Sequence, residues 1–181
     1  MADGFEETEA LAPLDILRRG GVEAKTVSIN DGKVVTGAHG VPVTADLSYD
    51  EFTSGIANGM EAMVFPGGMP GTKNLAAHEG LMDMMKSHYA EGGLLAAICA
   101  APGLVISQLP DLEGVKFTCY DGFEAPVIAK GGEYVKAPAV ACGKIITGRG
   151  PACAVDFGLA ILGALRGEEL AGEVGKAMML D

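Results

Sequence analysis

The segment GGLLAAICAAPGLV, residues 92–105, passes within a few positions from a short apolar run to a cluster of small residues. The run Leu94–Ile98 is too short for a helix and is typical of a parallel strand buried on both faces. Two alanines follow Cys99, and then Pro102, which the first turn of a helix tolerates because its missing N–H would have no partner there. The segment therefore predicts a strand, a sharp turn at Cys99 and a helix.

Cys99 lies on that predicted turn. A turn of this kind lifts a side chain above the carboxyl edge of a sheet, as in the nucleophile elbow of α/β hydrolases. The N-terminus of the next helix favours negative charge, so we expect the pKa of the thiol to be lowered. The alternative is a small core cysteine, the usual state of a free cysteine. The strand–turn–helix context favours the reactive thiol.

The composition is that of a globular α/β protein. A length of 181 residues suits one domain, residues 1–181, with a substantial core. An apolar content of 49% and 27 glycines suit tight turns between strands and helices. The net charge of −11 argues against nucleic acid or an anionic membrane surface as a partner. We expect small molecules or a second copy of the chain instead.

The four cysteines form no CxxC pair and no Cys/His ligand spacing, so no metal site is predicted. Three of them, Cys119, Cys142 and Cys153, are expected at core or structural positions. The sequence shows no secretory signal pattern and no apolar run near the roughly 20 residues of a membrane span. We therefore expect a reducing, cytoplasmic location with free thiols.

Strand and helix patterns alternate along the rest of the chain, which favours a mainly parallel sheet between helical layers. Helices are predicted over residues 8–19, 74–90, 152–165 and 168–180. Strands are predicted over residues 22–29, 62–65 and 116–120, with short strands within 34–44, a hairpin over 140–147, and a polar connection with a helical turn over 46–59.

A glycine-rich loop, Pro66–Gly71, follows the predicted strand 62–65. Adjacent glycines let backbone N–H groups point into a cleft, as an oxyanion hole requires. A plain turn between a strand and a helix has similar glycines, so the loop alone is a weak signal. In parallel sheets the site lies at the carboxyl ends of the strands. The loop, Cys99 and Tyr120 all fall at such ends, so we expect them to meet.

The chain resembles the ThiJ/PfpI family, and within it the branch that contains protein deglycases, in the segments ADGFEETEAL, VFPGGMPG, AAICAAPG, TCYDGFE and TGRGPACAVDFGLAIL. The resemblance covers essentially the whole chain in the right order. It implies a flavodoxin-like, doubly wound sheet sandwiched between helices. It also implies a homodimer and a reactive cysteine at the elbow.

The resemblance assigns roles to four residues of the expected centre. Cys99 matches the family's nucleophilic and oxidisable cysteine, and Glu9 matches the buried glutamic acid that hydrogen-bonds to it. Gly68 and Ala100 match the positions whose backbone N–H groups form the anion site.

Four further residues match the surroundings of that centre. Gly67, Arg149 and Pro151 match loop positions that shape the pocket and the dimer contact. Tyr120 stands where much of the deglycase branch has a histidine. A tyrosine can donate a hydrogen bond but is a poor base at neutral pH, because its reference pKa is about 10. We count Tyr120 as a candidate catalytic residue.

Histidine is absent from the motifs that would need it as a base. The peptidase branch has a histidine directly after its cysteine, and this chain has Ala100 there. We expect His39, His78 and His88 at structural or surface positions. Peptidase and glutamine amidotransferase activities therefore lack their general base and are not expected.

The family normally has an apolar strand of about six residues before the segment that matches ADG. Here Met1 directly precedes that segment. Such a strand would be central in a doubly wound sheet, and its loss would leave unpaired backbone groups in the core. We expect the native gene product to extend upstream of Met1, or the chain to have been cut there.

The leading functional hypothesis is a glyoxalase or deglycase that acts without a cofactor on 2-oxoaldehydes or their protein adducts. Cys99 would attack the aldehyde, the Gly68 and Ala100 N–H groups would hold the oxyanion, and Glu9 would move the proton. A carboxyl group beside a thiolate is expected to be protonated at rest, since like charges repel. The alternatives are an oxidative-stress sensor or redox-dependent chaperone based on Cys99, and an inert protein that retains only the fold.

Overall fold

The centre of the computed structural model, which describes residues 1–55 and 59–180, is a four-stranded sheet of order β5-β6-β10-β9. Strands β5 (Ala62–Phe65), β6 (Leu94–Ile98) and β10 (Ile145–Gly148) are parallel, and β9 (Ala139–Cys142) is antiparallel to β10. Three small sheets accompany it: β1 (Val27–Ser28) with β4 (Leu47–Ser48), β2 (Val34–Thr36) with β3 (Pro42–Thr44), and β7 (Lys116–Phe117) with β8 (Glu133–Tyr134).

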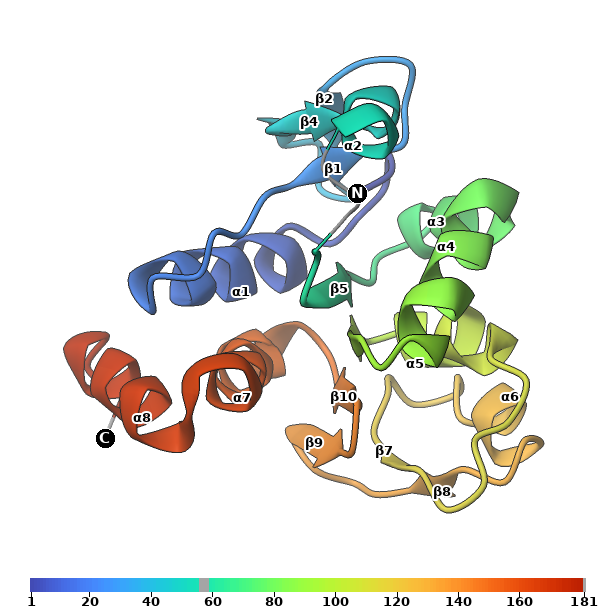
Figure 1. Ribbon diagram of the computed structural model, residues 1–181, viewed down its shortest axis with the longest axis vertical. Coiled ribbons are helices and arrows are strands. Elements are labelled where there is room, and N and C mark those ends of the chain that lie inside the picture. Colours follow the sequence, from blue (N-terminus) through green and yellow to red (C-terminus); the bar gives the residue numbers. More distant parts are fainter. Residues whose placement is uncertain (56–58, 181) are drawn as a thin grey trace.

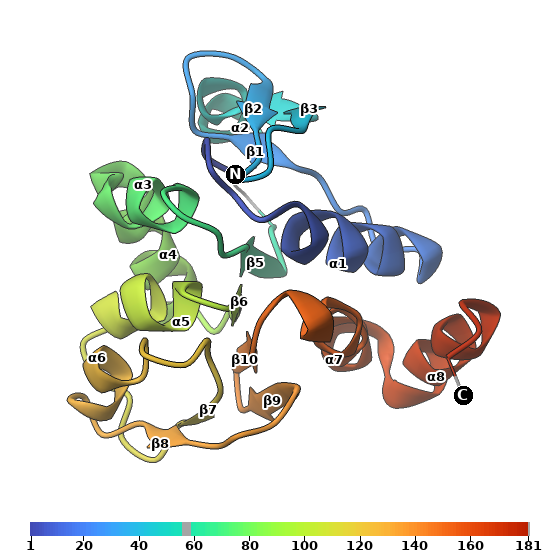
Figure 2. The same ribbon diagram turned by 180° about the vertical axis from the view of Figure 1, so that it is seen from behind.

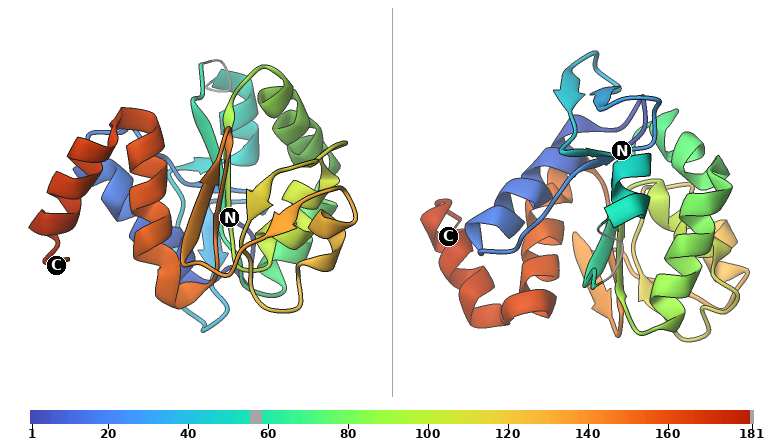
Figure 3. Two further views of the ribbon diagram at one scale, coloured as in Figure 1. Left: turned by 90° about the horizontal axis from the view of Figure 1, so that it is seen from below. Right: turned by 45° about the horizontal axis from the view of Figure 1, so that its top comes forward.

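Helices cover both faces of the central sheet (Figures 1 and 2). One face carries α1 (Glu7–Arg19), α7 (Ala154–Arg166) and α8 (Glu168–Ala177). The other face carries α3 (Gly71–Ala77), α4 (Glu79–Ala90), α5 (Ala101–Leu104) and α6 (Ala125–Ile128). Helix α2 (Tyr49–Gly55) packs beside β1 and β4, and short 3-10 turns occupy Ile106–Gln108 and Pro151–Cys153. Figure 3 shows the same two layers from other directions, and the predicted flavodoxin-like α/β sandwich is confirmed.

Strand β6 is buried along its whole length and divides the core in two. Leu95 and Ala97 point to the cluster under α3, α4 and α5, whereas Leu94, Ala96 and Ile98 point to the cluster under α1 and α7. This alternation is why the run of five apolar residues suits a strand covered on both faces. The predicted strand 94–98 is confirmed.

Helix α1 starts and ends where the sequence indicates. The carboxylate of Glu6 caps the helix by accepting the N–H of Glu9. Arg18 and Arg19 lie in the last turn, where positive charge interacts favourably with the helix dipole. Gly20 follows as the C-cap. The helix brings Glu9 into the interior from its first turn.

Several predicted boundaries are wrong, each for a tertiary reason. The strand expected over 22–29 is reduced to β1, which pairs only with the two residues of β4. The strand expected over 116–120 ends at Phe117. The next residue makes no strand-ladder bond: the Thr118 N–H donates to the hydroxyl of Thr147, and the Thr118 hydroxyl donates to the carbonyl of Ala137.

The helix expected over 74–90 is two helices, since His78 has an extended backbone between α3 and α4. The hairpin over 140–147 and the helix near 152–165 are present with boundaries shifted by one to two residues. The connection expected over 46–59 contains β4 and α2, and its residues 56–58 lie outside the described part.

Cys119 is fully buried, as expected, whereas Cys142 and Cys153 are half-buried and not part of the core. They lie at the end of β9 and in the turn before α7, where one side of each faces solvent. Among the residues described, no helix has the length and apolarity needed to cross a membrane.

Candidate active site

Cys99 lies on the turn directly after β6, and its backbone φ is +65°. This left-handed conformation is strained for a residue with a Cβ, and such residues cluster at functional sites. The Cys99 N–H donates to the carbonyl of Gly148 at 3.0 Å, and its carbonyl accepts the N–H of Tyr120 at 2.9 Å. Bonds to two neighbouring segments thus hold the turn in its strained form.

Two backbone N–H groups, those of Gly68 and Ala100, donate hydrogen bonds to the Cys99 sulfur. Gly68 has a φ of +88°, and a Cβ at this position would collide with the backbone of Gly4 and Glu6. A glycine is therefore required for the loop to turn its N–H toward the sulfur. The structure brings both predicted anion-site residues to the predicted cysteine.

Glu9 reaches the same point from the first turn of α1 and is fully buried. Its Oε2 accepts the N–H of Gly67 at 2.9 Å. Its Oε1 is buried and has no hydrogen-bond partner among the described residues. One N–H bond leaves both carboxylate oxygens able to take or give a proton, since each oxygen has two lone pairs.

Gly67 is the point where the carboxyl group, the thiol and the loop converge. A Cβ added there would overlap Glu9 Oε2 and Cys99 Cβ, and would lie 3.1 Å from the Cys99 sulfur. Only glycine leaves room for the two side chains to lie side by side. The requirement for glycine at position 67 thus has a steric basis in the contact with Glu9 and Cys99.

Burial dominates the electrostatics of this pair. It raises the pKa of Glu9 to about 7, against the contacts with Cys99 and the Gly67 N–H, which lower it. Burial and the neighbouring Glu9 carboxylate raise the pKa of the Cys99 thiol to about 12, despite the two N–H groups at the sulfur. The expected lowering of the thiol pKa is therefore wrong. The helix that should have lowered it, α5, has only four residues.

These two pKa values set the resting protonation of the site. The proton lies on the sulfur of Cys99, and Glu9 changes its charge near neutral pH. The raised pKa of Glu9 agrees with the protonated carboxyl group that the sequence suggested, whereas the raised pKa of Cys99 disagrees with the thiolate. In its carboxylate form, Glu9 is the group placed to remove the thiol proton.

The remaining predicted site residues, Tyr120, Arg149 and Pro151, lie on the segments that bond to the backbone of Cys99. The Tyr120 side chain is 51% exposed and its ring lies over Gly150. Arg149 donates to both carboxylate oxygens of Asp121, at 2.9 and 3.1 Å, and Pro151 is exposed next to it.

Two residues of the site were not predicted. Glu6 is buried and caps α1 by accepting the Glu9 N–H at 2.7 Å, and its charge helps raise the pKa of Glu9. Glutamate is not among the residues preferred at a helix N-cap, so the sequence gives little signal for this cap. Asp121, which fixes Arg149, has no such signal because the two residues meet only through the fold.

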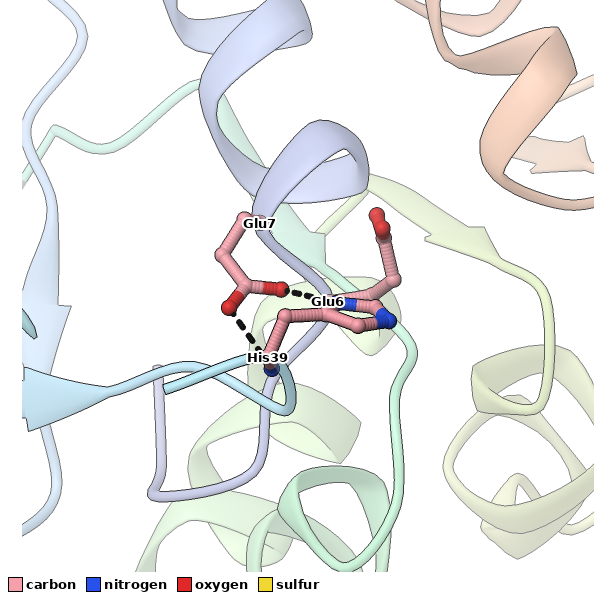
Figure 4. A group of neighbouring side chains, drawn as sticks. All are labelled: Glu6, Glu7 and His39. Carbon is pink, nitrogen blue, oxygen red and sulfur yellow. Dashed lines mark hydrogen bonds and ion pairs between the residues drawn. The ribbon is translucent and has the colours of Figure 1, made fainter. Parts of the chain in front are cut away.

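Glu6, Glu7 and His39 form a cluster beside the start of α1 (Figure 4). Glu7 accepts the backbone N–H of His39 and pairs with its ring nitrogen, both at 2.8 Å. This pairing raises the pKa of His39 and contributes to a lowered pKa of Glu7. The ion pair and the Glu6 cap account for the cluster without a further ligand.

The other two histidines have structural contacts. His78 caps α4, where its Nδ1 accepts the Leu81 N–H at 3.1 Å. The Nε2 atom of His88 lies 3.3 Å from the carbonyl of Leu94. The three histidines thus occupy structural or surface positions, as the sequence indicated, and none of them lies beside Cys99.

Comparison with known proteins gives a consistent set of relatives. The DJ-1/PfpI family model matches residues 1–164. Protein DJ-1 homolog A of Arabidopsis thaliana is 33% identical over 180 residues, which cover 99% of this chain and 45% of that protein. This chain thus spans less than half the length of that relative, and 40% of the Arabidopsis DJ-1 homolog B. A protein named as a deglycase from Pyrococcus abyssi is 32% identical over 150 residues, 83% of this chain and 87% of its own length.

Solved structures similar to this chain also include DJ-1 proteins. Drosophila melanogaster DJ-1beta has a TM-score of 0.90 and 31% identity, covering 100% of this chain and 95% of its own. A Toxoplasma gondii DJ-1 structure, described as oxidized, has a TM-score of 0.88 and 32% identity over 98% of this chain and 94% of its own. With the matching fold and the strained cysteine after β6, these findings show that the chain belongs to the DJ-1/PfpI family.

Proposed function

We propose that this protein is a cofactor-independent glyoxalase or deglycase that acts on 2-oxoaldehydes or their protein adducts through Cys99. The observation that carries the proposal is a buried carboxyl group with a pKa of about 7 beside a cysteine whose sulfur receives two backbone N–H groups. A relative of this chain is named as a deglycase, which supports the same chemistry.

The first step is addition of the thiol to the aldehyde. The sulfur of Cys99 forms a bond to the aldehyde carbon, and its proton passes to Glu9 Oε1, which has no other partner. The carbonyl oxygen becomes an oxyanion beside the Gly68 and Ala100 N–H groups, a contact worth about 3 kcal/mol per donor in other enzymes. Glu9 then gives the proton to that oxygen, and the product is a hemithioacetal.

The second step moves a hydrogen between neighbouring carbons. Glu9, again a carboxylate, removes the proton from the former aldehyde carbon and returns it to the adjacent carbonyl carbon through an enediol. The aldehyde carbon is oxidised to a thioester while its neighbour is reduced to an alcohol. Water hydrolyses the thioester to a 2-hydroxy acid and restores the thiol, so atoms and electrons balance without another reactant. A group with a pKa near 7 suits both directions of transfer.

The chemistry of a Cys–His hydrolase fits the site less well. Its base would be a histidine beside the thiol, and His39, His78 and His88 are engaged elsewhere with Glu7, Leu81 and Leu94. Peptidase and amidotransferase activities are therefore not proposed.

The proposal is tested by methylglyoxal consumption without added thiol. We expect Cys99→Ser and Glu9→Gln each to lower turnover by roughly 100-fold or more, because each removes a group that makes or breaks bonds. Cys142→Ser, a change at a half-buried cysteine far along the chain, is the matched control and should keep full turnover. Equal rates in the parent protein and in Cys99→Ser would contradict the proposal.

A separate variant tests the predicted catalytic role of Tyr120. Its half-exposed ring at the rim suits a hydroxyl that donates to the second carbonyl of the substrate. Tyr120→Phe should therefore raise KM for methylglyoxal more than it lowers kcat. Unchanged kinetics would remove Tyr120 from the site.

A second candidate function is a cysteine-based oxidative-stress sensor or redox-dependent chaperone. The observation that favours it is the pair of N–H groups at the Cys99 sulfur, which would equally stabilise a sulfinate. A relative with 32% identity has been described in an oxidized form. Peroxide titration that changes chaperone activity or partner binding, while methylglyoxal turnover stays at background, would favour this function over the enzyme.

A further inference from the structure

Two loops meet beside Cys99, and each of them bonds to its backbone. The Cys99 N–H donates to the carbonyl of Gly148 at 3.0 Å, and the Cys99 carbonyl accepts the N–H of Tyr120 at 2.9 Å. Gly148 ends β10, whereas Tyr120 lies in the loop between β7 and α6. The strained turn at Cys99 is therefore held between segments that come from different parts of the chain.

The residues that follow these two bonding partners form an ion pair with each other. Arg149 follows Gly148, and Asp121 follows Tyr120. The Arg149 guanidinium donates to Asp121 Oδ1 at 2.9 Å and to Oδ2 at 3.1 Å. The two backbone bonds of Cys99 and this ion pair form a closed ring of contacts, which we call the Cys99 clasp.

A second contact joins the same two loops. A Cβ placed on Gly150 would lie 3.3 Å from Cδ2 and 3.8 Å from Cε2 of Tyr120, so one edge of the ring packs on the Gly150 backbone. The ring contact and the ion pair thus come from successive residues on each loop. One contact alone would leave a loop free to rotate about it, whereas two adjacent contacts also fix its orientation.

Both partners of the ion pair have further contacts that place them. The Tyr134 hydroxyl of β8 donates to Asp121 Oδ1 at 3.5 Å, and the Tyr134 ring packs edge-on against Phe117, with ring centres 5.7 Å apart. The backbone N–H of Arg149 donates to the Pro138 carbonyl at 3.0 Å. The Arg149 guanidinium lowers the pKa of Asp121, which keeps this carboxylate charged at neutral pH.

Local bonds shape the loop that carries Tyr120. The Phe123 N–H donates to the Tyr120 carbonyl at 3.1 Å, and the Gly122 N–H donates to both carboxylate oxygens of Glu124, at 2.9 and 3.0 Å. Such bonds fold the loop onto itself and do not set its orientation against residues 148–150. The Cys99 clasp makes the contacts that do.

The orientation of the turn decides whether the Cys99 sulfur meets its hydrogen-bond donors. With a φ of +65°, Cys99 has a strained backbone that neighbouring segments must hold in place. In this conformation the Gly68 and Ala100 N–H groups contact the sulfur and favour its thiolate form. Rotation of the turn would move the sulfur away from these groups and from Glu9.

We propose that Asp121 and Arg149 are positioning residues whose ion pair keeps the Cys99 thiol in its reactive orientation toward electrophilic carbon atoms. They act on the sulfur through the backbone bonds that Tyr120 and Gly148 make to Cys99. This inference rests on Cys99 as the reactive group of the proposed function, and it holds for any aldehyde that the site takes.

General support of the fold is a different role, and exposure separates the two. The side chains of Arg149 and Asp121 are 32% and 65% exposed, and exposed ion pairs add little to the free energy of unfolding. Loss of the pair should therefore shift Tm by roughly 3 °C or less. The orientation of the thiol should change far more.

The test measures how fast iodoacetamide alkylates Cys99 and Cys142 in the folded protein, by mass spectrometry of the two peptides. We expect Asp121→Ala, Arg149→Ala and the double variant to slow alkylation of Cys99 by one common factor, roughly 10-fold, because misplacement of a reacting atom lowers its rate steeply. Equal losses in the single and double variants identify one shared contact. Cys142, at the other end of the β9–β10 pair from Gly148, should react at an unchanged rate.

Asp15→Ala is the matched control. It removes the ion pair with Arg19 on α1, whose side chains are 52% and 49% exposed, and it changes the net charge as Asp121→Ala does. Alkylation of Cys99 should keep its rate in this control. A slower rate in the control, or an unchanged or faster rate in Asp121→Ala, would overturn the proposal. So would losses that multiply in the double variant, or faster alkylation of Cys142.

These outcomes do not depend on the proposed enzyme. Alkylation reports the orientation of the thiol whether or not methylglyoxal is consumed. Where methylglyoxal is consumed, kcat should fall in Asp121→Ala by a factor similar to that for alkylation. Turnover that requires Cys99 but is the same in Asp121→Ala would support the enzyme and overturn the role of the ion pair.

Discussion

Glu9 is the residue in which burial, hydrogen bonding and chemistry meet. Its carboxyl group is fully buried, receives one N–H from Gly67 and leaves one oxygen without a partner. The cost of holding a charge there raises its pKa to about 7. At the neighbouring atom, the same burial keeps the proton on Cys99. The reactivity of this site thus depends on Glu9 as much as on the cysteine.

Glu9 also makes the stability of the protein depend on pH. Its pKa is raised from 4.5 in the unfolded chain to about 7 in the folded one, so between these values the folded state binds more protons. Its contribution is therefore fully present below pH 4.5 and is lost as the pH rises through 7, a change of up to about 3 kcal/mol. We expect Glu9→Gln to remove this loss. Urea denaturation of both proteins from pH 4.5 to 8 measures the difference, and parallel curves would contradict the assignment.

Gly67 provides a steric test at the same scale. A Cβ there would overlap Glu9 and Cys99, so Gly67→Ala should lower the free energy of unfolding by about 1–3 kcal/mol and reduce turnover. Gly32→Ala is the matched control, because a Cβ at Gly32 meets no atom within 4 Å. Thermal denaturation and methylglyoxal consumption give the two readouts. A Gly67→Ala protein that resembles the control would show that the two side chains are not held against the loop.

At the scale of elements, the break between α3 and α4 depends on one side chain, which accepts a backbone N–H that has no partner within the helix. His78 leaves the helical conformation, and its Nδ1 accepts the N–H of Leu81 in the first turn of α4. Its ring also lies 4.4 Å from that of Tyr49, centre to centre. This cap lets α4 start in a new direction and place Met82 and Met85 in the core.

We expect His78→Ala to cost about 1 kcal/mol of stability, the usual loss for a helix N-cap. His78→Asn should keep most of the stability, since asparagine offers an acceptor to the same N–H. Chemical denaturation at pH 7.5 compares the three proteins. Equal losses in both variants would assign the effect of His78 to its contact with Tyr49 instead of the cap.

At the scale of the whole molecule, the two helical layers position the site from opposite faces of the sheet (Figure 1). Helix α1 brings Glu9 from one layer, and the loop that precedes α3 brings Gly67 and Gly68 from the other. Strand β6 carries Cys99 between them. The packing of α1 on α7 therefore controls the distance between the carboxyl group and the thiol.

Gly158 tests this long-range dependence. It lies where α7 crosses α1, and a Cβ there would come within 2.8 Å of Ile16 Cδ1 and 3.0 Å of Pro13 Cα. Gly158→Ala should push α1 outward, lower stability by about 1–3 kcal/mol and reduce turnover through Glu9. Gly172→Ala, the same change in α8 with open space around it, should instead stabilise by up to about 1 kcal/mol. If both variants were stabilised, α1 would not be held by this contact.

The oligomeric state is a further prediction at this scale. The resemblance implies a homodimer, and Arg149 and Pro151 are the residues that it assigns to the contact. Analytical ultracentrifugation should give twice the chain mass of 18.5 kDa. A sedimenting species of one chain mass at micromolar concentration would contradict it.

The sequence by itself determined the elements whose signal is local. The apolar run 94–98, the glycine pair after residue 65 and the capped helix near residues 8–19 predicted strand, loop and helix correctly, because periodicity and end residues act over a few neighbours. The resemblance to the ThiJ/PfpI family placed Glu9, Gly68 and Ala100 beside Cys99, and the structure brings these residues together.

Only the tertiary structure decided what depends on neighbours distant in the chain. Residues 22–29 form a short strand because a ladder needs a partner, and β4 supplies just two residues of one. The direction of the thiol pKa came from burial and from Glu9, a residue 90 positions away, rather than from the adjacent helix end. The cavity of about 630 Å³ likewise exists only because the fold brings residues 21–27 near residues 59–66. Local patterns fix conformation, whereas desolvation and strand pairing are set by whichever segments the fold packs side by side.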